Sequence, residues 1–307
     1  MRFGFALPQI GSVAGPQALI TVAKRAEDLG FDSLWVLDRI LWPINPRAPY
    51  PIGDGSLPVQ YKNVLDPVEV LTFAAAHTKR IAVATGVLNL PWYNPVLLAR
   101  RLSTVDVLSN GRLRIGFGIG WSPDEYEAAG AEWEDRGKRT DEAIKVLKKI
   151  WTSDSVEFEG KYYRIAKSFI GPKPVQKPYP PIYMAAFTPS ALKRVALEAN
   201  GWLPVGIPLT GIATMFEEIK KMAKDAGRNP AELELVISAG VVIHERPVDK
   251  ERAEFTGSLD QIAEDFASAR KVGAHELAIY AQFLSEGQTA DDLVARMEKL
   301  WALAKQV

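Results

Sequence analysis

Residues 81–118 read IAVATGVLNLPWYNPVLLARRLSTVDVLSNGRLRIGFG and contain one complete strand–helix–strand unit. The apolar run at residues 81–87 predicts a buried strand, and residues 112–118 predict a second one. Between them, Asn94 and Pro95 form a typical helix start, in which asparagine caps the helix and proline occupies its first turn. Two buried strands joined by a helix predict a parallel pair with a helical crossover.

The same alternation continues in both directions along the 307 residues. Further strands are predicted at residues 2–7, 33–38, 181–186, 201–205, 234–243 and 276–280. Further helices are predicted at residues 16–30, from Asp66-Pro67, at 135–152, from Thr188-Pro189, at 211–227, at 258–273 and near the carboxyl terminus. Eight strands alternating with eight helices favour a closed (β/α)₈ TIM barrel over an open doubly wound sheet. No change of composition marks a boundary, so we expect one domain over residues 1–307.

Two long segments interrupt this rhythm, and we assign them as insertions after strands 2 and 4. Residues 39–65 are rich in proline, glycine and aromatic residues, which predicts an ordered lid that carries Trp42 and Tyr50. Residues 153–180 predict a hairpin in which 156–158 pair with 162–164. We expect both segments to rise over the carboxyl end of the barrel, where barrel enzymes place their active sites. Alternatively, the aromatic residues of the lid form a subunit contact.

Composition excludes several classes of function. The 37 basic residues balance the 37 acidic ones, so the chain lacks a basic footprint for nucleic acid. It has no cysteine, and its three histidines lie far apart, so we expect no metal site. No apolar run approaches the roughly 20 residues needed to span a membrane. The amino terminus does not resemble a signal peptide, so we expect a cytoplasmic enzyme.

Candidate chemistry lies where the predicted strands end. Asp38 ends the second strand and would point into the barrel mouth, unless it only pairs with Arg39. In Gly116-Phe117-Gly118-Ile119-Gly120-Trp121, alternating glycines could let a flat ring lie against the backbone, although close packing would explain them as well. The run is no dinucleotide fingerprint, because Trp121 stands where the sixth position requires glycine.

The junction Ala185-Ala186-Phe187-Thr188-Pro189-Ser190 suits an anion. Backbone N–H groups are free at a helix start, and the helix dipole is positive there. Ordinary capping by Thr188 is expected at the same time.

Gly118-Ile119-Gly120-Trp121, followed by Glu125-Tyr126, resembles the luciferase-like oxidoreductases. The resemblance extends over nearly the whole chain and includes residues 31–38, 85–95, 109–113, 158–163, 172–176 and 181–204. It implies a (β/α)₈ barrel that binds a flavin or the deazaflavin coenzyme F420, and the branch most resembled depends on the deazaflavin. Many relatives have histidine where this chain has Arg39, and sugar-phosphate dehydrogenases of the family have glutamate where it has Trp121.

The resemblance also implies roles for individual residues. The Gly86-Val87 peptide would be cis and press on the central ring of the cofactor, and Asp38 and Arg39 would be the catalytic side chains near ring and substrate. The lid would place Trp42 and Tyr50 on the substrate side. The implied cofactor-binding residues are Thr85, Gly86, Val87, Gly118, Ile119, Gly120, Trp121, Ala186, Phe187 and Thr188, of which the last three would hold the phosphate.

We therefore expect a homodimeric enzyme that transfers a hydride between coenzyme F420 and a small organic substrate. An FMN-dependent monooxygenase is the first alternative. A glycosidase using Asp38 and Glu125 and a non-catalytic flavin-binding protein are the others. Because F420 carries an acidic tail, basic residues at the barrel rim would favour it; the candidates are Arg47, Lys161, Arg164 and Lys167.

Overall fold

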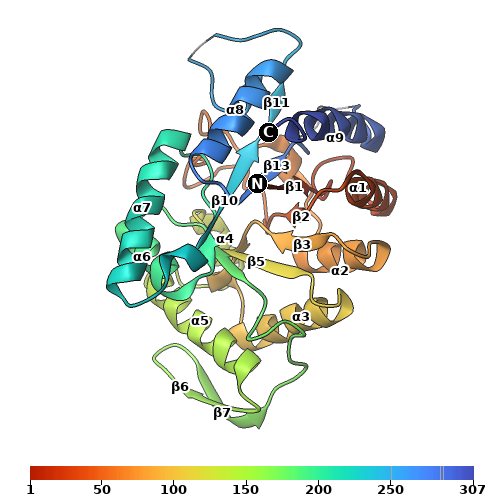
Figure 1. Cartoon of the computed structure of the whole chain (residues 1–307). Helices are drawn as coiled ribbons and strands as arrows, with labels where there is room; N and C mark the ends of the chain where they lie inside the picture. The colour runs from red at the N-terminus through yellow and green to blue at the C-terminus, as the bar shows by residue number, and fades with distance from the viewer. Residues whose placement is uncertain (250, 284, 286) are drawn as a thin grey trace.

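The computed structural model describes the whole chain except residues 250, 284 and 286. In this described part, eight parallel strands close into a barrel, and the pairing of β3 with β5 completes the ring (Figure 1). The order around the ring is β3-β2-β1-β13-β10-β9-β8-β5. These strands are β1 (Arg2–Ala6), β2 (Ser33–Val36), β3 (Ala82–Thr85), β5 (Leu113–Gly118), β8 (Ile182–Met184), β9 (Gly201–Trp202), β10 (Glu234–Gly240) and β13 (Glu276–Tyr280). The closed barrel is thus confirmed over the open sheet.

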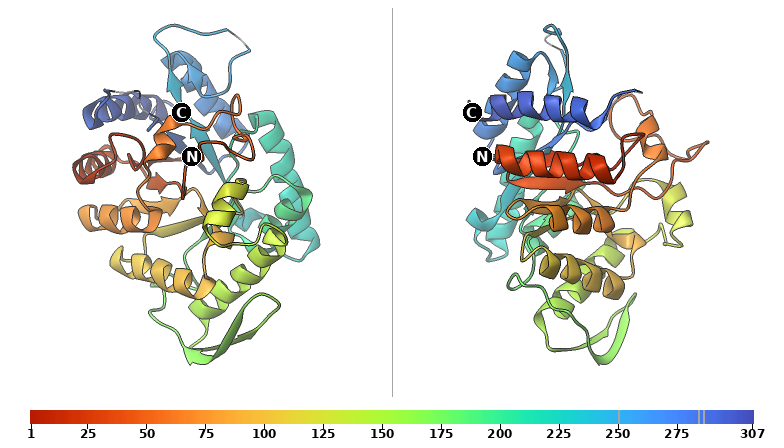
Figure 2. Two further views of the ribbon diagram at one scale, coloured as in Figure 1. Left: turned by 180° about the vertical axis from the view of Figure 1, so that it is seen from behind. Right: turned by 90° about the vertical axis from the view of Figure 1, so that its right-hand side faces the viewer.

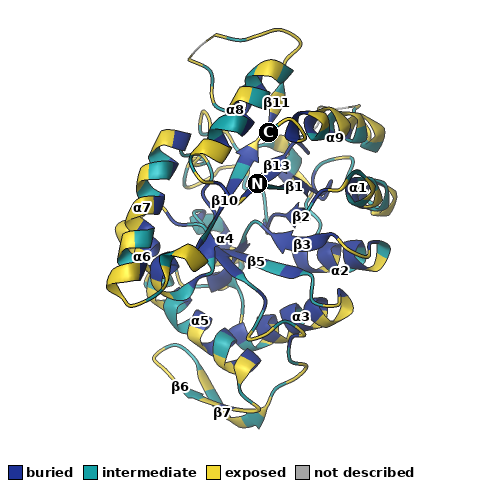
Figure 3. Cartoon of the chain, viewed as in Figure 1, coloured by how far each residue is buried: buried dark blue, intermediate teal, exposed yellow. Residues whose placement is uncertain are grey.

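Helices surround the barrel with their apolar faces inward, as the blue inner and yellow outer surfaces in Figure 3 show. They are α1 (Pro16–Leu29), α2 (Pro67–His77), α3 (Pro95–Leu108), α5 (Arg136–Thr152), α6 (Pro189–Glu198), α7 (Leu209–Asp225), α8 (Leu259–Lys271) and α9 (Ala290–Ala304). Asp66, Asn94, Thr188 and Ser258 cap their helices as predicted. None of the helices in the described residues combines the length and the apolar character that a bilayer crossing requires.

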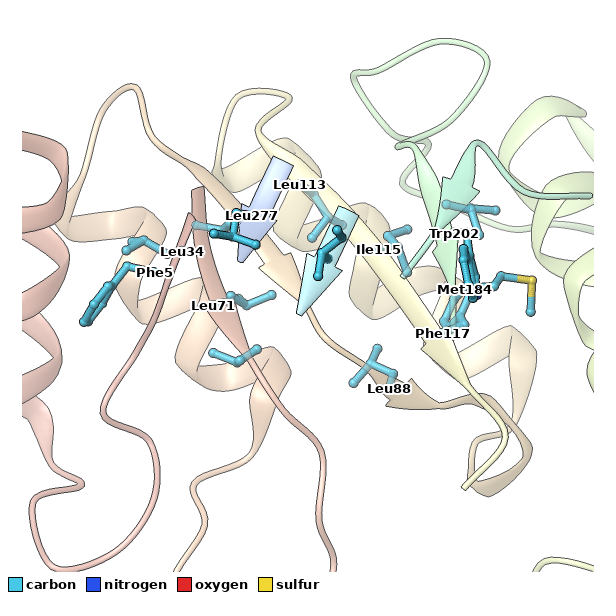
Figure 4. Close-up of a cluster of buried hydrophobic side chains, with 14 of the residues drawn as sticks. Phe5, Leu34, Leu71, Leu88, Leu113, Ile115, Phe117, Met184, Trp202 and Leu277 are labelled. Carbon is cyan, nitrogen blue, oxygen red and sulfur yellow. The ribbon is translucent and has the colours of Figure 1, made fainter. Parts of the chain in front are cut away.

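Two apolar layers hold the fold together. One lies between the sheet and the helices and includes Phe5, Leu34 and Ile115 (Figure 4). The other fills the barrel and includes Trp35 and Tyr280. Strand residues alternate between these layers because successive side chains of a strand point to opposite faces.

The amino end of the barrel is closed by buried ion pairs. Glu276 is fully buried, and its carboxylate pairs with Arg2, at 3.0 Å, and with Arg114. Its other oxygen accepts a hydrogen bond from the Ser33 hydroxyl. With the amino end filled in this way, the carboxyl end is left for ligands.

The lid, residues 39–65, follows β2 directly and includes the short helix η1 (Val59–Lys62). In the side view of Figure 2 it projects from the barrel on the side opposite to the two termini, together with α4 (Pro123–Ala128). The side chain of Gln9 fixes both ends of the lid, because its amide donates to the carbonyl oxygens of Leu37 and Leu65. The first insertion therefore lies at the carboxyl end of the barrel, and its role as a lid stays a prediction.

The second insertion is a hairpin of β6 (Ser155–Glu159) and β7 (Arg164–Phe169), but its predicted position is wrong. It lies on the flank beside α5, at the bottom of Figure 1, and not over the carboxyl end. The reason is that it follows the helix α5 and not a strand, so it runs back along the outside of this helix, where its turn contacts Glu142 and Asp135. Glu159 pairs with Arg164, so Tyr162 and Tyr163 lie in the turn and not in a strand.

Several short elements complete the chain: β4 (Leu88–Asn89), η2 (Leu90–Trp92), η3 (Pro230–Glu232), β11 (Val242–Ile243) and β12 (Thr256–Gly257). The helix α4 lies directly after β5 and was not predicted. In α2 the side chain of Asp66 caps the helix, and the carboxylate of Glu69 in the first turn binds Arg101.

Candidate active site

Asp38 lies at the carboxyl end of β2 with its carboxyl group buried in the barrel mouth. Its Oδ2 accepts hydrogen bonds from the backbone N–H of Asn89 and from the hydroxyl of Tyr93, both at 3.0 Å. Burial raises the pKa of Asp38 to about 7, because the charged form loses its hydration. Among the described residues no cation pairs with this carboxyl group, and Oδ1 accepts no hydrogen bond. Asp38 is therefore poised to gain or lose a proton near neutral pH.

Arg39 is paired with Glu125 and not with Asp38, which corrects one of the readings of the sequence. Its Nη1 lies 3.0 Å from Glu125 Oε2, and the two side chains are 7 % and 0 % exposed. The guanidinium carbon lies 5.0 Å from the centre of the Trp121 ring and 5.4 Å from that of Tyr61. Burial raises the pKa of Glu125, while the charge of Arg39 opposes this change. The pair joins the root of the lid to α4.

Aromatic contacts extend the lid across the mouth. The Tyr50 ring lies 5.6 Å from Trp121 and 6.0 Å from Tyr61, and Tyr61 in turn lies 5.8 Å from Phe283. Trp42 packs in the same cluster, beneath the ammonium group of Lys62. The lid thus contacts both the segment after β5 and the segment after β13, on opposite sides of the ring of strands.

The Gly86-Val87 peptide is cis, as predicted. The hydroxyl of Tyr280 donates to the carbonyl oxygen of Gly86 at 3.1 Å, and a Cβ atom on Gly86 would lie only 2.1 Å from that hydroxyl oxygen. Thr85 is fully buried and uses its hydroxyl to bond the N–H and the C=O of Gly116, both at 2.9 Å. Its side chain is therefore already engaged in the barrel wall.

The alternating glycines of β5 allow close packing of neighbouring chain. A Cβ on Gly116 would lie 2.1 Å from the carbonyl oxygen of Thr85, and one on Gly118 would lie 2.6 Å from a methyl group of Val87. Gly120 has a φ of +71°, which a residue with a side chain rarely adopts. Close packing therefore accounts for these glycines, and the side of Gly118 on which a ring was expected holds Val87.

The junction of β8 and α6 is held rigidly beside the mouth. The indole of Trp202 donates to the carbonyl oxygen of Ala186 at 3.0 Å, and Ala185 donates its N–H to Phe117. Thr188 caps α6 through a hydrogen bond from the N–H of Ala191. The side chain of Phe187 is exposed. This arrangement presents a capped helix start to any anion bound there.

The structure brings most predicted site residues to the carboxyl end and adds others. Tyr93 and Asn89 appeared only as motif positions, and Glu125 only as a motif position and in the glycosidase alternative. Gln282 was missed, although its place two residues after the last strand is the signal that would have found it.

The basic residues expected at the rim are mostly paired with carboxylates. Arg47 contacts Asp124 and Glu127 at 3.0 and 2.8 Å, Lys161 contacts Asp135, and Arg164 contacts Glu159. These pairs reduce the positive charge available to an acidic cofactor tail.

A cleft of about 680 Å³ lies elsewhere, between the amino-terminal ends of α8 and α9. None of the predicted site residues lines it. Its charges are mixed, with Asp260 and Asp292 near Arg296 and Lys299.

The chain is similar to enzymes that use different cofactors. It is 34 % identical to an F420-dependent glucose-6-phosphate dehydrogenase of Amycolatopsis mediterranei, over 62 % of this chain and 53 % of that protein. It is 31 % identical to an FMNH₂-dependent dimethylsulfone monooxygenase of Pseudomonas putida, over 50 % of this chain and 42 % of that protein. The chain thus matches about half the length of these relatives.

The fold has counterparts among solved structures. The monooxygenase RslO1 of Streptomyces bottropensis superimposes with a TM-score of 0.80 at 21 % identity, over 98 % of each chain. A family model described as luciferase-like monooxygenase matches residues 1–304. The chain belongs to the luciferase-like monooxygenase family.

Proposed function

We propose that this chain is a coenzyme F420-dependent oxidoreductase that transfers a hydride to or from a small organic substrate. The observation that carries the proposal is the Asp38 carboxyl group, buried at the barrel mouth with a pKa of about 7 and no cationic partner among the described residues. Reducing a carbonyl group requires a proton at its oxygen, and oxidising an alcohol releases one. A carboxyl group that titrates near neutral pH serves both directions.

Asp38 performs this task through its unbonded oxygen. Tyr93 and Asn89 both bond Oδ2, so they fix the plane of the carboxyl group and leave Oδ1 toward the mouth. The protonated group donates to a substrate oxygen, and the ionised group accepts a proton from it. We infer that Arg39, paired with Glu125, positions the lid over this group and excludes water.

The residues present suit a coenzyme with a flat ring and a phosphate. The capped start of α6 offers backbone N–H groups and a positive dipole end to the phosphate, through Ala186, Phe187 and Thr188. Gly86, Val87 and residues 118–121 would flank the ring. When bound, the coenzyme supplies the carbon that gives or accepts the hydride.

The choice of F420 is supported by the relative from Amycolatopsis and by the motifs shared with the deazaflavin-dependent branch. An FMN-dependent monooxygenase is the second candidate, and the relative from Pseudomonas putida favours it. The basic residues that would have favoured F420 are mostly paired with carboxylates, which removes one argument for this coenzyme. A homodimer and a cytoplasmic location stay predictions.

Anaerobic turnover tests the proposal. The protein is incubated with oxidised F420 and a panel of alcohols, and with reduced F420 and the matching ketones, while the visible spectrum of the coenzyme is recorded. We expect the spectrum to change without oxygen in the wild type and at least 100-fold more slowly in Asp38→Asn. Product formation that needs reduced FMN and oxygen would favour the second candidate instead.

A further inference from the structure

Gln282 carries a buried amide group that has no partner. The residue is 1 % exposed, and neither its Oε1 nor its Nε2 makes a hydrogen bond within the described part of the chain. Buried amides nearly always have partners, because losing water without gaining a hydrogen bond is costly. An amide with both atoms unbonded therefore calls for a ligand.

Gln282 lies at the mouth of the barrel. Along β13, Ala278 and Tyr280 face the barrel interior, whereas Leu277 and Ile279 face the helices. Gln282 follows two residues after the end of this strand, at the carboxyl end of the barrel, and the next residue, Phe283, packs against the same interior cluster as Tyr280. Its neighbour Phe283 packs against Tyr61 of the lid.

The ring of strands places Gln282 on the substrate side. The residues proposed to hold the cofactor follow β3, β5 and β8, which are consecutive in the ring. β13 lies opposite β5, four strands away in either direction. Gln282 therefore lies across the mouth from this group of residues, beside the Phe283 that contacts the lid.

Gln9 provides a matched comparison within the same chain. It is as buried as Gln282 and also follows a barrel strand, β1. Both of its amide atoms are bonded, to the backbone of Leu37 and Leu65. The hydrogen bonds of Gln9 thus stabilise the ligand-free fold, whereas no group among the described residues bonds the amide of Gln282.

We propose that the carboxamide of Gln282 binds the substrate, and that the substrate is an uncharged molecule with a carbonyl or hydroxyl group on an apolar ring. An amide offers one donor and one acceptor, so it bonds a ketone oxygen through Nε2 and an alcohol through both atoms. The nearby Arg39 is already neutralised by Glu125, which disfavours an anionic substrate. The aromatic lid residues Tyr50 and Tyr61 suit an apolar ring. This inference rests on the proposed function only in treating the mouth as the substrate site.

Two measurements on Gln282→Met and Gln9→Met test the proposal. The first is thermal unfolding without ligands. Removing an unbonded buried amide should raise the melting temperature of Gln282→Met by about 2–4 °C. Gln9→Met should melt at a lower temperature than the wild type, because it loses bonds that the fold uses. A fall for Gln282→Met similar to that of Gln9→Met would overturn the proposal, since it would show that the resting protein supplies the partners.

The second measurement compares the binding of acetophenone with that of ethylbenzene, which lacks the oxygen. Tryptophan fluorescence reports the binding, with and without F420. Asp38 also bonds the ketone oxygen, so the informative quantity is the ratio of the two affinities. This preference for the ketone should be about tenfold larger in the wild type than in Gln282→Met, the value of one hydrogen bond. A preference of equal size in the wild type and in Gln282→Met would overturn the proposal. Binding is measured without F420 as well, so a failure of F420 to bind would count against the proposed function and not against the role of Gln282.

Discussion

Asp38 is held by bonds that fix its orientation while burial disfavours its charge. The folded protein binds the proton of this group more tightly than the unfolded chain, since its pKa is about 7 against an ordinary 3.8. Below about pH 4 the group is neutral in both states, and above pH 7 it is charged in both. Stability should therefore fall as the pH rises between these values, by at most about 4 kcal/mol.

Asp38→Asn should remove this dependence. We expect the variant to gain free energy of unfolding relative to the wild type at pH 8 and to gain little at pH 4, because the amide never carries the buried charge. Urea unfolding at the two pH values measures the difference. Asp28→Asn, at an exposed position, is the control and should change neither value. An equal effect of Asp38→Asn at both pH values would contradict the raised pKa.

Arg39 and Glu125 should depend on each other for stability. Arg39→Met leaves a buried carboxyl group without its cation, and Glu125→Gln leaves a buried guanidinium group, so each change should cost about 3–5 kcal/mol. The double variant should lose clearly less than the sum, because neither charge is then left unpaired. Urea unfolding of the three variants provides the cycle, and additive losses would show that the pair is not coupled.

The sequence indicated individual residues of the site, but it did not indicate which residues pair with each other. Asp38 was predicted because it lies at a strand end, and the cis Gly86-Val87 peptide was predicted from the resemblance to the luciferase-like oxidoreductases. The pairing of Arg39 with Glu125 was not predicted, since it joins two segments far apart in the sequence that meet only when the barrel closes. The glycines of β5 had two interpretations, space for a flat ring or close packing, and the approach of Thr85 and Val87 to Gly116 and Gly118 favours close packing.

Among the helices, α6 offers a substitution whose effects on stability and on phosphate binding should differ in sign. An acidic residue at a helix start stabilises the helix through its dipole, but it repels a phosphate bound at the same place. Phe187→Asp should therefore unfold at the same urea concentration as the wild type or a higher one, yet bind F420 at least tenfold more weakly. Leu197→Asp, near the other end of the same helix, is the control and should bind F420 normally. Unchanged affinity in Phe187→Asp would exclude this helix start as the phosphate site.

The lid should act through the aromatic ring of Tyr50. Tyr50→Ala removes its contacts with Trp121 and Tyr61, so water should enter the mouth and turnover should fall about tenfold or more. Ile44→Ala is a control in the same segment, because the side chain of Ile44 is 85 % exposed. Gel filtration follows the oligomeric state of both variants. If Tyr50→Ala keeps its turnover but dissociates, the segment is a subunit interface and not a lid.

At the scale of the whole molecule, the barrel was predictable because each strand–helix unit carries its own local signals. The caps Asn94, Thr188 and Ser258 lie where the sequence placed them. The position of the β6–β7 hairpin was not predictable from local pattern. It depends on how the hairpin packs against α5, which the sequence of the hairpin does not show. That the amide of Gln282 has no partner among the described residues likewise emerges only from the folded structure.

Equilibrium binding of the two rival coenzymes decides whether this barrel uses F420. The purified protein is titrated with F420 and, separately, with FMN, and coenzyme fluorescence reports the bound fraction. We expect a dissociation constant for F420 at least tenfold below that for FMN, with Phe187→Asp weakening F420 binding. A dissociation constant for FMN below that for F420 would contradict this expectation.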